Sequence, residues 1–235
     1  IIEEDGSPKI MSKDKKVSVI IRAKNEERWI GHAIQSVIDH IESPEIIIID
    51  NHSSDETLAI ARTFQADPEL ENSNRFTEIK IISIDDYSPG RALNLGVQNS
   101  SHDYILILSS HCVLKEFNLT KHVTDSSKYA AIFGNQIPKY NGRTIQKRYL
   151  WSHFGDVEVV NMFSDMEDRY FFHNALSFFK KDILIQEPFN EVLTGKEDRY
   201  WAIDIIKGKK EILYDPTMSA DHHYTPNGNT WKGIG

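Results

Sequence analysis

Four short, largely apolar runs alternate with helical patterns through the first half of the chain. The runs occupy 17–21, 45–50, 80–84 and 104–109 and are rich in aliphatic residues. Such runs are typical of strands that are buried on both faces of a parallel sheet. The repeated order of strand, helix and strand predicts βαβ units with right-handed crossovers. We therefore expect an α/β fold whose mainly parallel sheet is flanked by helices.

The segments between these runs have the periodicity of amphipathic helices. The first segment repeats apolar residues at helical spacing, at Trp29, Ile30, Ala33, Ile34, Val37, Ile38 and Ile41. Asn25 is expected at the N-terminus of this helix, where a side-chain oxygen can accept from a free backbone N–H group. We expect Ser53, Ser54 or Asp55 to cap the second helix, and Pro89 to lie in the first turn of the third.

The second half of the chain is less regular. Strands are expected over 130–137 and 211–216, and a strand followed by a helix is expected over 173–184. A further helix is expected over 194–210, with Gly208 as its stop signal. No internal repeat or linker divides the sequence, which indicates one domain built from two halves.

Composition disfavours several classes of protein. The formal net charge of −8 argues against a general nucleic-acid binder, because phosphate binding requires a basic face. The single cysteine, Cys112, rules out an intrachain disulfide framework and fits a reducing compartment. No stretch approaches the roughly 20 apolar residues of a membrane span, and no signal peptide is recognisable. We expect a cytoplasmic protein, with peripheral association at the inner face of the membrane left open.

Polar clusters follow three of the predicted strands, at 22–26, 50–54 and 109–112. Ligands of open α/β sheets bind beyond the carboxyl ends of the strands. Any one of these clusters alone is more often a strand end or a helix cap, but the three together favour a binding site. The sequence has no GxGxxG after the first strand, no Walker A loop and no GxSxG elbow, which disfavours dinucleotide, P-loop and α/β-hydrolase chemistry.

The order of these motifs resembles family 2 glycosyltransferases with the GT-A fold. The resemblance is carried by "VSVIIRAKNEERWIGHAIQSV", "IIIIDNHSSDETLAIA" and "SPGRALNLGVQNSSHDYILILSSHCVL" in the first half. In the second half, "IFGNQIPKYNG" and "EPFNEVLTGKEDRYWAIDIIKGKKEILYDPTMSADHHY" are similar to the rhamnosyltransferase-like branch. The similarity spans about 17–224, and it lies in the order and spacing of the motifs rather than in any one of them. It implies a GT-A-like, Rossmann-related sheet with a small antiparallel addition.

The resemblance also implies different roles for different parts of the chain. Residues 1–16 would be a leader, 17–114 the nucleotide-sugar-binding half, and 115–235 the acceptor-binding and catalytic half of the same domain. The implied activity is transfer of a sugar, with inversion, from a nucleotide-sugar donor to a saccharide or glycolipid acceptor in a surface glycan such as capsule or lipopolysaccharide. The alternative is a non-catalytic sugar- or nucleotide-binding module of a larger glycan-synthesis protein. A nucleotidylyltransferase is disfavoured, because "RAKNEERW" contains no glycine.

Roles for individual residues follow from the resemblance. Asp50 would accept a hydrogen bond from the nucleotide base. The base and ribose pocket would be lined by Arg22, Ala23, Asn25 and Glu26.

The phosphates and the acceptor would be served by other residues. Arg91 would lie near the diphosphate, where its fork of N–H donors matches phosphate oxygens, and Ser110 and His111 would adjoin it. Asp198 would be the general base for the acceptor hydroxyl, with Glu197 beside it. Without the family, Arg91 is equally well a surface charge, and the two carboxylates are more often helix caps.

The sequence departs from the family at 109–112, where an Asp-x-Asp motif usually binds Mg²⁺ or Mn²⁺ and the chain has Ser-Ser-His-Cys. Three interpretations stay open. His111 could bind a softer metal such as Mn²⁺ together with His222 or His223. The leaving group could instead be stabilised without metal by Arg91 or another cation, or activity could have been lost.

Some prominent residues have simpler expected roles. The histidine pair lies in a polar segment, 220–235, that is expected to form a tail, and in isolation such a pair is more often on the surface. Cys112 is expected to be buried rather than nucleophilic. Trp201 is expected in the core rather than against the acceptor.

Overall fold

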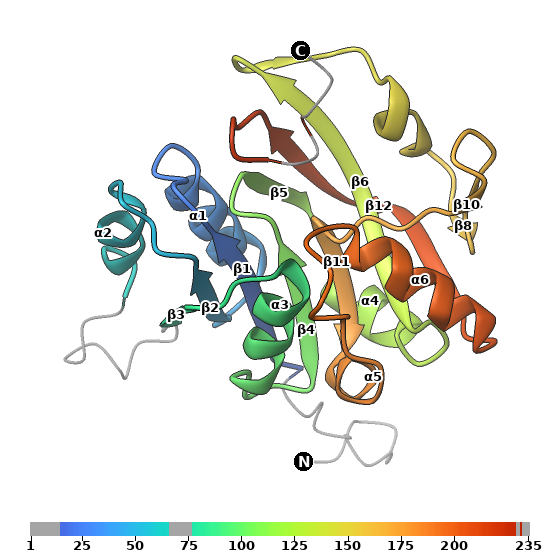
Figure 1. The fold of residues 1–235 in the computed structure, drawn as a ribbon, viewed down its shortest axis with the longest axis horizontal. Coiled ribbons are helices and arrows are strands. Elements are labelled where there is room, and N and C mark those ends of the chain that lie inside the picture. Colours follow the sequence, from blue (N-terminus) through green and yellow to red (C-terminus); the bar gives the residue numbers. More distant parts are fainter. Residues whose placement is uncertain (1–14, 66–76, 229–230, 232–235) are drawn as a thin grey trace, which may run out of the picture.

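The structure, a computed structural model, describes residues 15–65, 77–228 and 231 (Figure 1). The predicted leader therefore lies almost wholly outside the described residues. The alternation predicted for the first half is confirmed. Its elements are β1 (Val17–Ala23), α1 (Ile30–His40), β2 (Glu45–Asp50), α2 (Thr57–Arg62), β3 (Glu78–Ser83), α3 (Pro89–Gln98) and β4 (Tyr104–Leu108).

The second half adds shorter and more varied elements. It contributes an antiparallel part to the sheet, as expected. The elements are β5 (Cys112–Glu116), α4 (Leu119–Asp125), β6 (Ala131–Tyr140), β7 (Arg143–Thr144), the 3₁₀ helix η2 (Tyr149–His153), β8 (Val159–Val160), β9 (Phe163–Ser164), β10 (Arg169–Tyr170), β11 (Leu176–Lys180), α5 (Lys181–Gln186), α6 (Glu197–Lys207) and β12 (Ile212–His223).

One sheet runs through both halves of the chain, in the order β3-β2-β1-β4-β11-β6-β12-β5. β1 pairs in parallel with both β2 and β4. The strand order therefore reverses between β1 and β4, which is the topological switch point where open α/β sheets bind ligands. β11 is antiparallel to β4 and β6, and β5 is antiparallel to β12.

Helices cover both faces of this sheet (Figure 1). The core under α3, α5 and α6 receives Ile20 of β1. The core under α1 and α4 receives Val19 and Ile21. Successive strand residues point to opposite faces, so an apolar run fills both cores at once. No helix within the described ranges is long and apolar enough to cross a membrane.

The predicted polar tail is wrong in its first part. β12 continues to His223, because a register irregularity between Asp215 and Ser219 lets the strand resume its pairing with β6. The Asp215 carboxylate stabilises the irregular turn by accepting from the backbone N–H and the hydroxyl of Thr217, at 2.9 and 2.7 Å. His222 is consequently a strand residue with a fully buried side chain.

One of the predicted helix caps is wrong, and a second is displaced by one residue. α1 begins at Ile30, and Asn25 lies before it with a positive φ of 52°. Its side chain accepts from the backbone N–H of Ser54 at 2.8 Å, so a contact with the loop after β2 replaces the local cap. The N-cap position of α2 is Glu56, but Asp55, one of the predicted caps, accepts from the backbone N–H of Thr57 at 3.0 Å. Pro89 does begin α3, as predicted.

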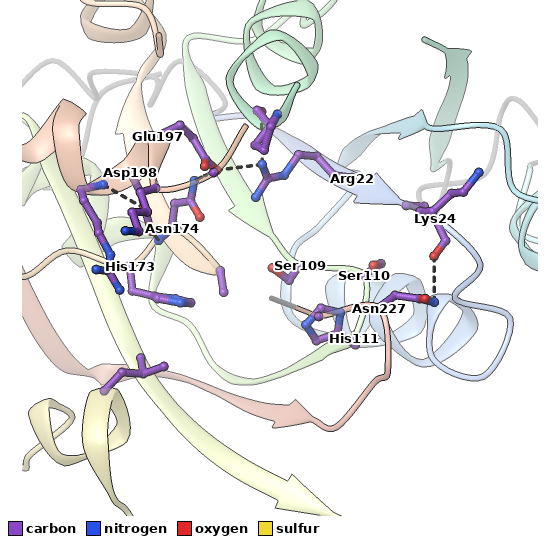
Figure 2. A pocket seen from close by; sticks show the side chains of 18 of the residues that line it. Arg22, Lys24, Ser109, Ser110, His111, His173, Asn174, Glu197, Asp198 and Asn227 are labelled. Carbon is purple, nitrogen blue, oxygen red and sulfur yellow. Dashed lines mark hydrogen bonds and ion pairs between the residues drawn. The ribbon is translucent and has the colours of Figure 1, made fainter. Parts of the chain in front are cut away.

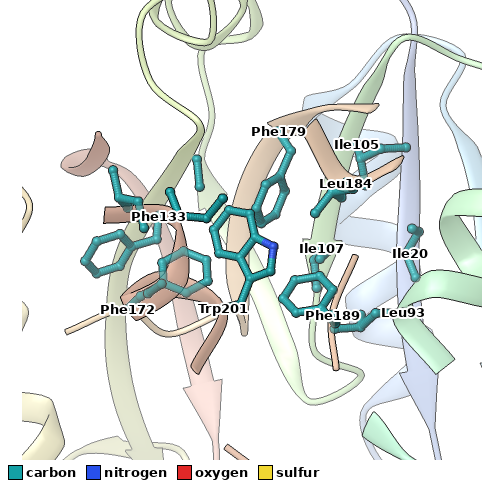
Figure 3. Packing of buried hydrophobic residues seen from close by; sticks show 14 of the residues in the cluster. Ile20, Leu93, Ile105, Ile107, Phe133, Phe172, Phe179, Leu184, Phe189 and Trp201 are labelled. Carbon is teal, nitrogen blue, oxygen red and sulfur yellow. The ribbon is translucent and has the colours of Figure 1, made fainter. Parts of the chain in front are cut away.

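Trp201 lies in the core, as expected (Figure 3). Its ring lies 5.5 Å from the rings of Phe172, Phe179 and Phe189, and its Nε1 donates to the backbone oxygen of Glu187 at 2.7 Å. The helix is thereby fixed against the sheet, which places the start of α6 at the switch point.

We expect Trp201→Ala to lower the free energy of unfolding by about 3–5 kcal/mol, the usual range for emptying a large aromatic site. Urea denaturation followed by circular dichroism would measure the change. Tyr200→Ala is the matched control, because Tyr200 is on the same helix and is 51 % exposed. Its loss should stay within about 0.5 kcal/mol. Equal losses for the two variants would contradict the placement of α6.

Candidate active site

A cavity of about 640 Å³ opens at the carboxyl ends of β1 and β4 (Figure 2). Its walls come from several parts of the chain. Among them are the end of β1 (Arg22, Ala23, Lys24), the turn after β4 (Ser109, Ser110, His111), the segment before β11 (His173, Asn174) and the start of α6 (Lys196, Glu197, Asp198, Arg199). Residues of both halves of the chain thus face one space.

Glu197 joins the two sides of this cavity. Its Oε1 lies 2.8 Å from Nη1 of Arg22, and it also accepts from the side-chain amide of Asn174 at 3.3 Å. Arg22 donates further to the backbone oxygen of Pro89 at 3.1 Å. Burial alone would raise the pKa of Glu197, but the charge of Arg22 and the hydrogen bonds outweigh it and hold the pKa below its usual value. Glu197 is therefore a carboxylate that holds Arg22 in place.

Asp198 lies beside it in a different environment. Burial, and then the negative charge of Glu197, raise the pKa of Asp198 to about 6. The backbone N–H groups of Arg199 and Asn174, at 2.8 and 3.4 Å, oppose this rise only in part. A carboxyl group with such a pKa is deprotonated at neutral pH and is a stronger base than an ordinary aspartate. Adjacent carboxyl groups whose pKa values are shifted in opposite directions are a pattern found in acid–base sites.

His173 and Asn174 are site residues that sequence reasoning missed. Asn174 holds both carboxylates, through its side chain and its backbone N–H group. His173 lines the cavity, and burial lowers its pKa to about 3, so it is neutral. The signal was a polar His-Asn pair directly before an apolar strand, and the pair reaches the site because β11 runs antiparallel to β4.

The structure brings two of the three candidate metal ligands together and separates the third. Nε2 of His111 lies 3.1 Å from Nε2 of His222. The Nδ1 of His222 contacts the side-chain oxygen of Gln136 at 2.9 Å. His223 points to the opposite face of β12 and stacks on Trp29, with 3.9 Å between ring centroids. Of the two alternatives for a partner of His111, the structure therefore selects His222 and excludes His223.

The remaining predicted residues divide into two groups. Ala23, Glu26 and Ser110 line the cavity, whereas Asn25 and Asp50 lie behind its wall. Asp50 pairs with Ala23 across the β1–β2 register and is buried. Its Oδ2 accepts from the backbone N–H of Ser53 at 3.0 Å, and its Oδ1 has no hydrogen-bond partner among the described residues.

Arg91 lies outside the cavity wall. Its guanidinium forms ion pairs with Asp86 and with Glu191, the latter at 3.3 Å. Cys112 is buried, as expected, and burial raises the pKa of its thiol well above the usual value.

The chain is similar in sequence to proteins of known function. A family model described as glycosyl transferase family 2 matches residues 18–187. The GalNAc(5)-diNAcBac-PP-undecaprenol beta-1,3-glucosyltransferase of Campylobacter jejuni is 25 % identical over 211 residues, which are 85 % of this chain and 62 % of that protein. The O-antigen chain rhamnosyltransferase WbaN of Salmonella anatum is 20 % identical over 83 % of this chain and 61 % of its own length. The chain thus spans about three fifths of these relatives.

Solved structures share the fold. S. aureus TarS in complex with UDP-GlcNAc superposes with a TM-score of 0.69 at 17 % identity, covering 93 % of this chain and 61 % of that one. GalNAc-T7 with UDP, GalNAc and Mn²⁺ gives a TM-score of 0.67 at 17 % identity, covering 91 % of this chain and 44 % of that one. These are GT-A glycosyltransferases, and the observed sheet confirms the predicted GT-A-like architecture. Since the family model covers most of the described residues, the chain belongs to glycosyl transferase family 2.

Proposed function

We propose that this chain catalyses transfer of a sugar, with inversion, from a nucleotide-sugar donor to a hydroxyl group of a saccharide or glycolipid acceptor. The observation that carries this proposal is Asp198. It is a cavity-lining carboxyl group whose pKa is raised to about 6, and it faces the switch point of a GT-A sheet. A purely nucleotide-binding module would have no use for a base in this position.

The reaction would be a single displacement. Asp198 takes the proton of the acceptor hydroxyl while the hydroxyl oxygen bonds to the anomeric carbon of the donor sugar. The bond between that carbon and the diphosphate oxygen breaks, and the nucleoside diphosphate leaves with the bonding electron pair. Attack opposite to the leaving group inverts the anomeric centre. Glu197 holds Arg22 across the cavity and raises the basicity of Asp198 through its charge.

The donor nucleotide would lie against the ends of β1 and β2. Asp50 is the acceptor proposed for an N–H group of the base: its Oδ1, just behind the cavity wall, has no hydrogen-bond partner among the described residues, and buried polar atoms usually have partners. Ala23 and Glu26 line the adjoining cavity. UDP is the first nucleotide to test, since TarS and GalNAc-T7 bind it.

The side chains at the turn after β4 do not fit the divalent cation that the fold family implies there. Residues 109–112 offer no carboxylate, whereas Mg²⁺ and Mn²⁺ prefer oxygen ligands. Within the described ranges, no group of three or more His, Cys, Asp or Glu side chains could hold an ion. We assign no step to a metal. Arg22 and Lys24, which line the cavity, are the proposed cations for the leaving diphosphate.

The place of this reaction is proposed from the relatives. The Campylobacter enzyme is named for an undecaprenol-linked saccharide, and WbaN for the O-antigen chain. We propose a lipid-linked or saccharide acceptor of a bacterial surface glycan, such as capsule or lipopolysaccharide, used in the cytoplasm at the inner face of the membrane.

Nucleotide binding tests the donor half of the proposal. We expect UDP at about 100 times its dissociation constant to raise the melting temperature by about 5 °C, equally with Mn²⁺ and with EDTA. A ligand that binds only the folded state stabilises it by mass action. Mn²⁺ and EDTA should give the same shift, because residues 109–112 include no carboxylate that could hold a metal ion against the diphosphate. Differential scanning fluorimetry with UDP, dTDP, GDP and CMP measures this shift.

Two variants sharpen the test. Asp50→Asn should greatly reduce the shift that UDP produces, whereas Asp39→Asn, on the exposed side of α1, should leave it unchanged. Stabilisation only with Mn²⁺, abolished by His111→Ala, would overturn the metal-free proposal. No stabilisation by any of the four nucleotides would overturn the donor assignment.

A further inference from the structure

Two arginines line the cavity on the side of Asp198. Arg199 is the next residue along α6, and Arg169 is in β10. Both guanidiniums contact one carboxylate, Glu167, which also lines the cavity. Nη1 of Arg199 lies 3.2 Å from Oε1 of Glu167, and Nη2 of Arg169 bonds the other oxygen. This arginine pair, Arg169 and Arg199, therefore carries one positive charge more than its shared carboxylate neutralises.

The two arginine side chains are partly shielded from solvent. The side chain of Arg169 is 12 % exposed and that of Arg199 is 34 % exposed. Burial, and then the charge of Arg199, lower the pKa of Arg169. Nε of Arg169 is buried and has no hydrogen-bond partner in the described part of the chain. The charge of Asp198 offsets part of the repulsion between the two arginines, and a bound anion would offset more of it.

The donors of the arginine pair are numerous. Each guanidinium has five N–H groups in a planar fork that matches a carboxylate or a phosphate. Arg169 uses donors on Glu167 and on the backbone oxygen of Tyr170. For Arg199, the ion pair with Glu167 is the one polar interaction of the side chain among the described residues. Arg199, the more exposed of the two, therefore has donors left for a ligand at the cavity wall.

We propose that the arginine pair binds an anionic group of the acceptor, either a sugar carboxylate or a phosphate. This inference rests on the proposed function, because it places the acceptor hydroxyl at Asp198. Since Arg199 directly follows Asp198, an anion held there belongs to the molecule that presents its hydroxyl to the base. The diphosphate of the donor is placed at the ends of β1 and β4 instead. The acceptor is thus a negatively charged saccharide, not a neutral one.

The competing explanation is structural, in which Glu167 and the two arginines only tie the β9–β10 hairpin to α6. The two explanations differ for Glu167→Gln. If the pair binds an anion, removal of the competing carboxylate should tighten binding of anionic probes. If the cluster only holds the hairpin against α6, Glu167→Gln loosens the hairpin and anion binding does not increase.

The test follows the arginine Nε–H resonances by ¹H–¹⁵N NMR of the full chain with saturating UDP. Methyl glucuronoside and glucose 6-phosphate are the anionic probes, and methyl glucoside is the neutral match. We expect the anionic probes to shift Arg169 and Arg199 saturably, with methyl glucoside at least about tenfold weaker. The better of the two anionic probes identifies carboxylate or phosphate as the group.

Variants complete the design. Arg199→Gln should weaken the anionic probes by about tenfold or more, and Glu167→Gln should strengthen them. Arg143→Gln is the matched control, because Arg143 is exposed and makes no ion pair within the described ranges. Equal binding of charged and neutral probes, or no response of the arginine pair, would overturn the proposal. A missing UDP response at β1 and β4 in the same samples would instead count against the proposed function.

Discussion

Asp198→Asn should lower the rate of sugar transfer by about 10²–10⁴-fold while nucleotide binding stays unchanged. Asparagine has nearly the shape of aspartate but cannot take the proton of the acceptor hydroxyl, and a positioned general base contributes about this factor. The native carboxyl group is suited to the task because burial and the charge of Glu197 raise its pKa to about 6. The measurement is release of nucleoside diphosphate from the donor, with the acceptor or with water as the attacking group.

The control for this variant is Asp204→Asn. Asp204 is on the same helix, α6, but is exposed and away from the cavity wall. The Asp204→Asn variant should transfer the sugar at the wild-type rate, and both variants should show the same UDP-induced rise in melting temperature. If Asp198→Asn left every measurable activity untouched, the base assignment would fail and a non-catalytic binding module would be the better description.

The first half of the fold could be predicted because its signals are local. Each strand is an apolar run that fills two cores, so β2 was predicted residue for residue as Glu45–Asp50. The cap of α1 was not predictable in this way. The side chain of Asn25 accepts a hydrogen bond from a loop that is distant along the chain, and no local sequence pattern predicts such a contact. The extension of β12 past Pro216 depends similarly on its pairing with β6.

The candidate site, too, could be predicted only in part. The resemblance marked Glu197 and Asp198, and the cavity contains both. It did not indicate that Glu197 pairs with Arg22, because the two residues are far apart in the sequence and meet only through the fold. Nor did it separate the histidines. The alternation of side chains along a strand means that His222 and His223 cannot both face His111, but only the observed register shows which one does.

Glu197→Gln should shift the acid limb of the pH–rate profile to lower pH. In the wild type, Asp198 must lose its proton to act as a base, so kcat/KM should rise as the pH passes through about 6. The charge of Glu197 is one cause of that raised pKa, and glutamine removes it while Arg22 continues to lower the pKa. The half-maximal point should therefore fall below pH 6, and the rate at neutral pH should drop because Asp198 becomes a weaker base. The profile is measured with saturating donor between pH 4.5 and about 8, a range that brackets the pKa of about 6 of Asp198.

The same substitution should also destabilise the fold. Breaking a buried ion pair by removing one partner costs about 3–5 kcal/mol, and the loss here should be about 2–3 kcal/mol because 20 % of the Arg22 side chain is exposed. Since the pKa of Glu197 is below its usual value, the ion pair contributes at neutral pH and is lost as acid protonates Glu197. The wild-type advantage over Glu197→Gln in urea denaturation should therefore shrink as the pH falls. Glu187→Gln is the control, because its pair with Lys210 is exposed and should matter little. An acid limb that stays at pH 6 in Glu197→Gln would show that the charge of Glu197 does not act on the base, and that burial alone sets the pKa of Asp198.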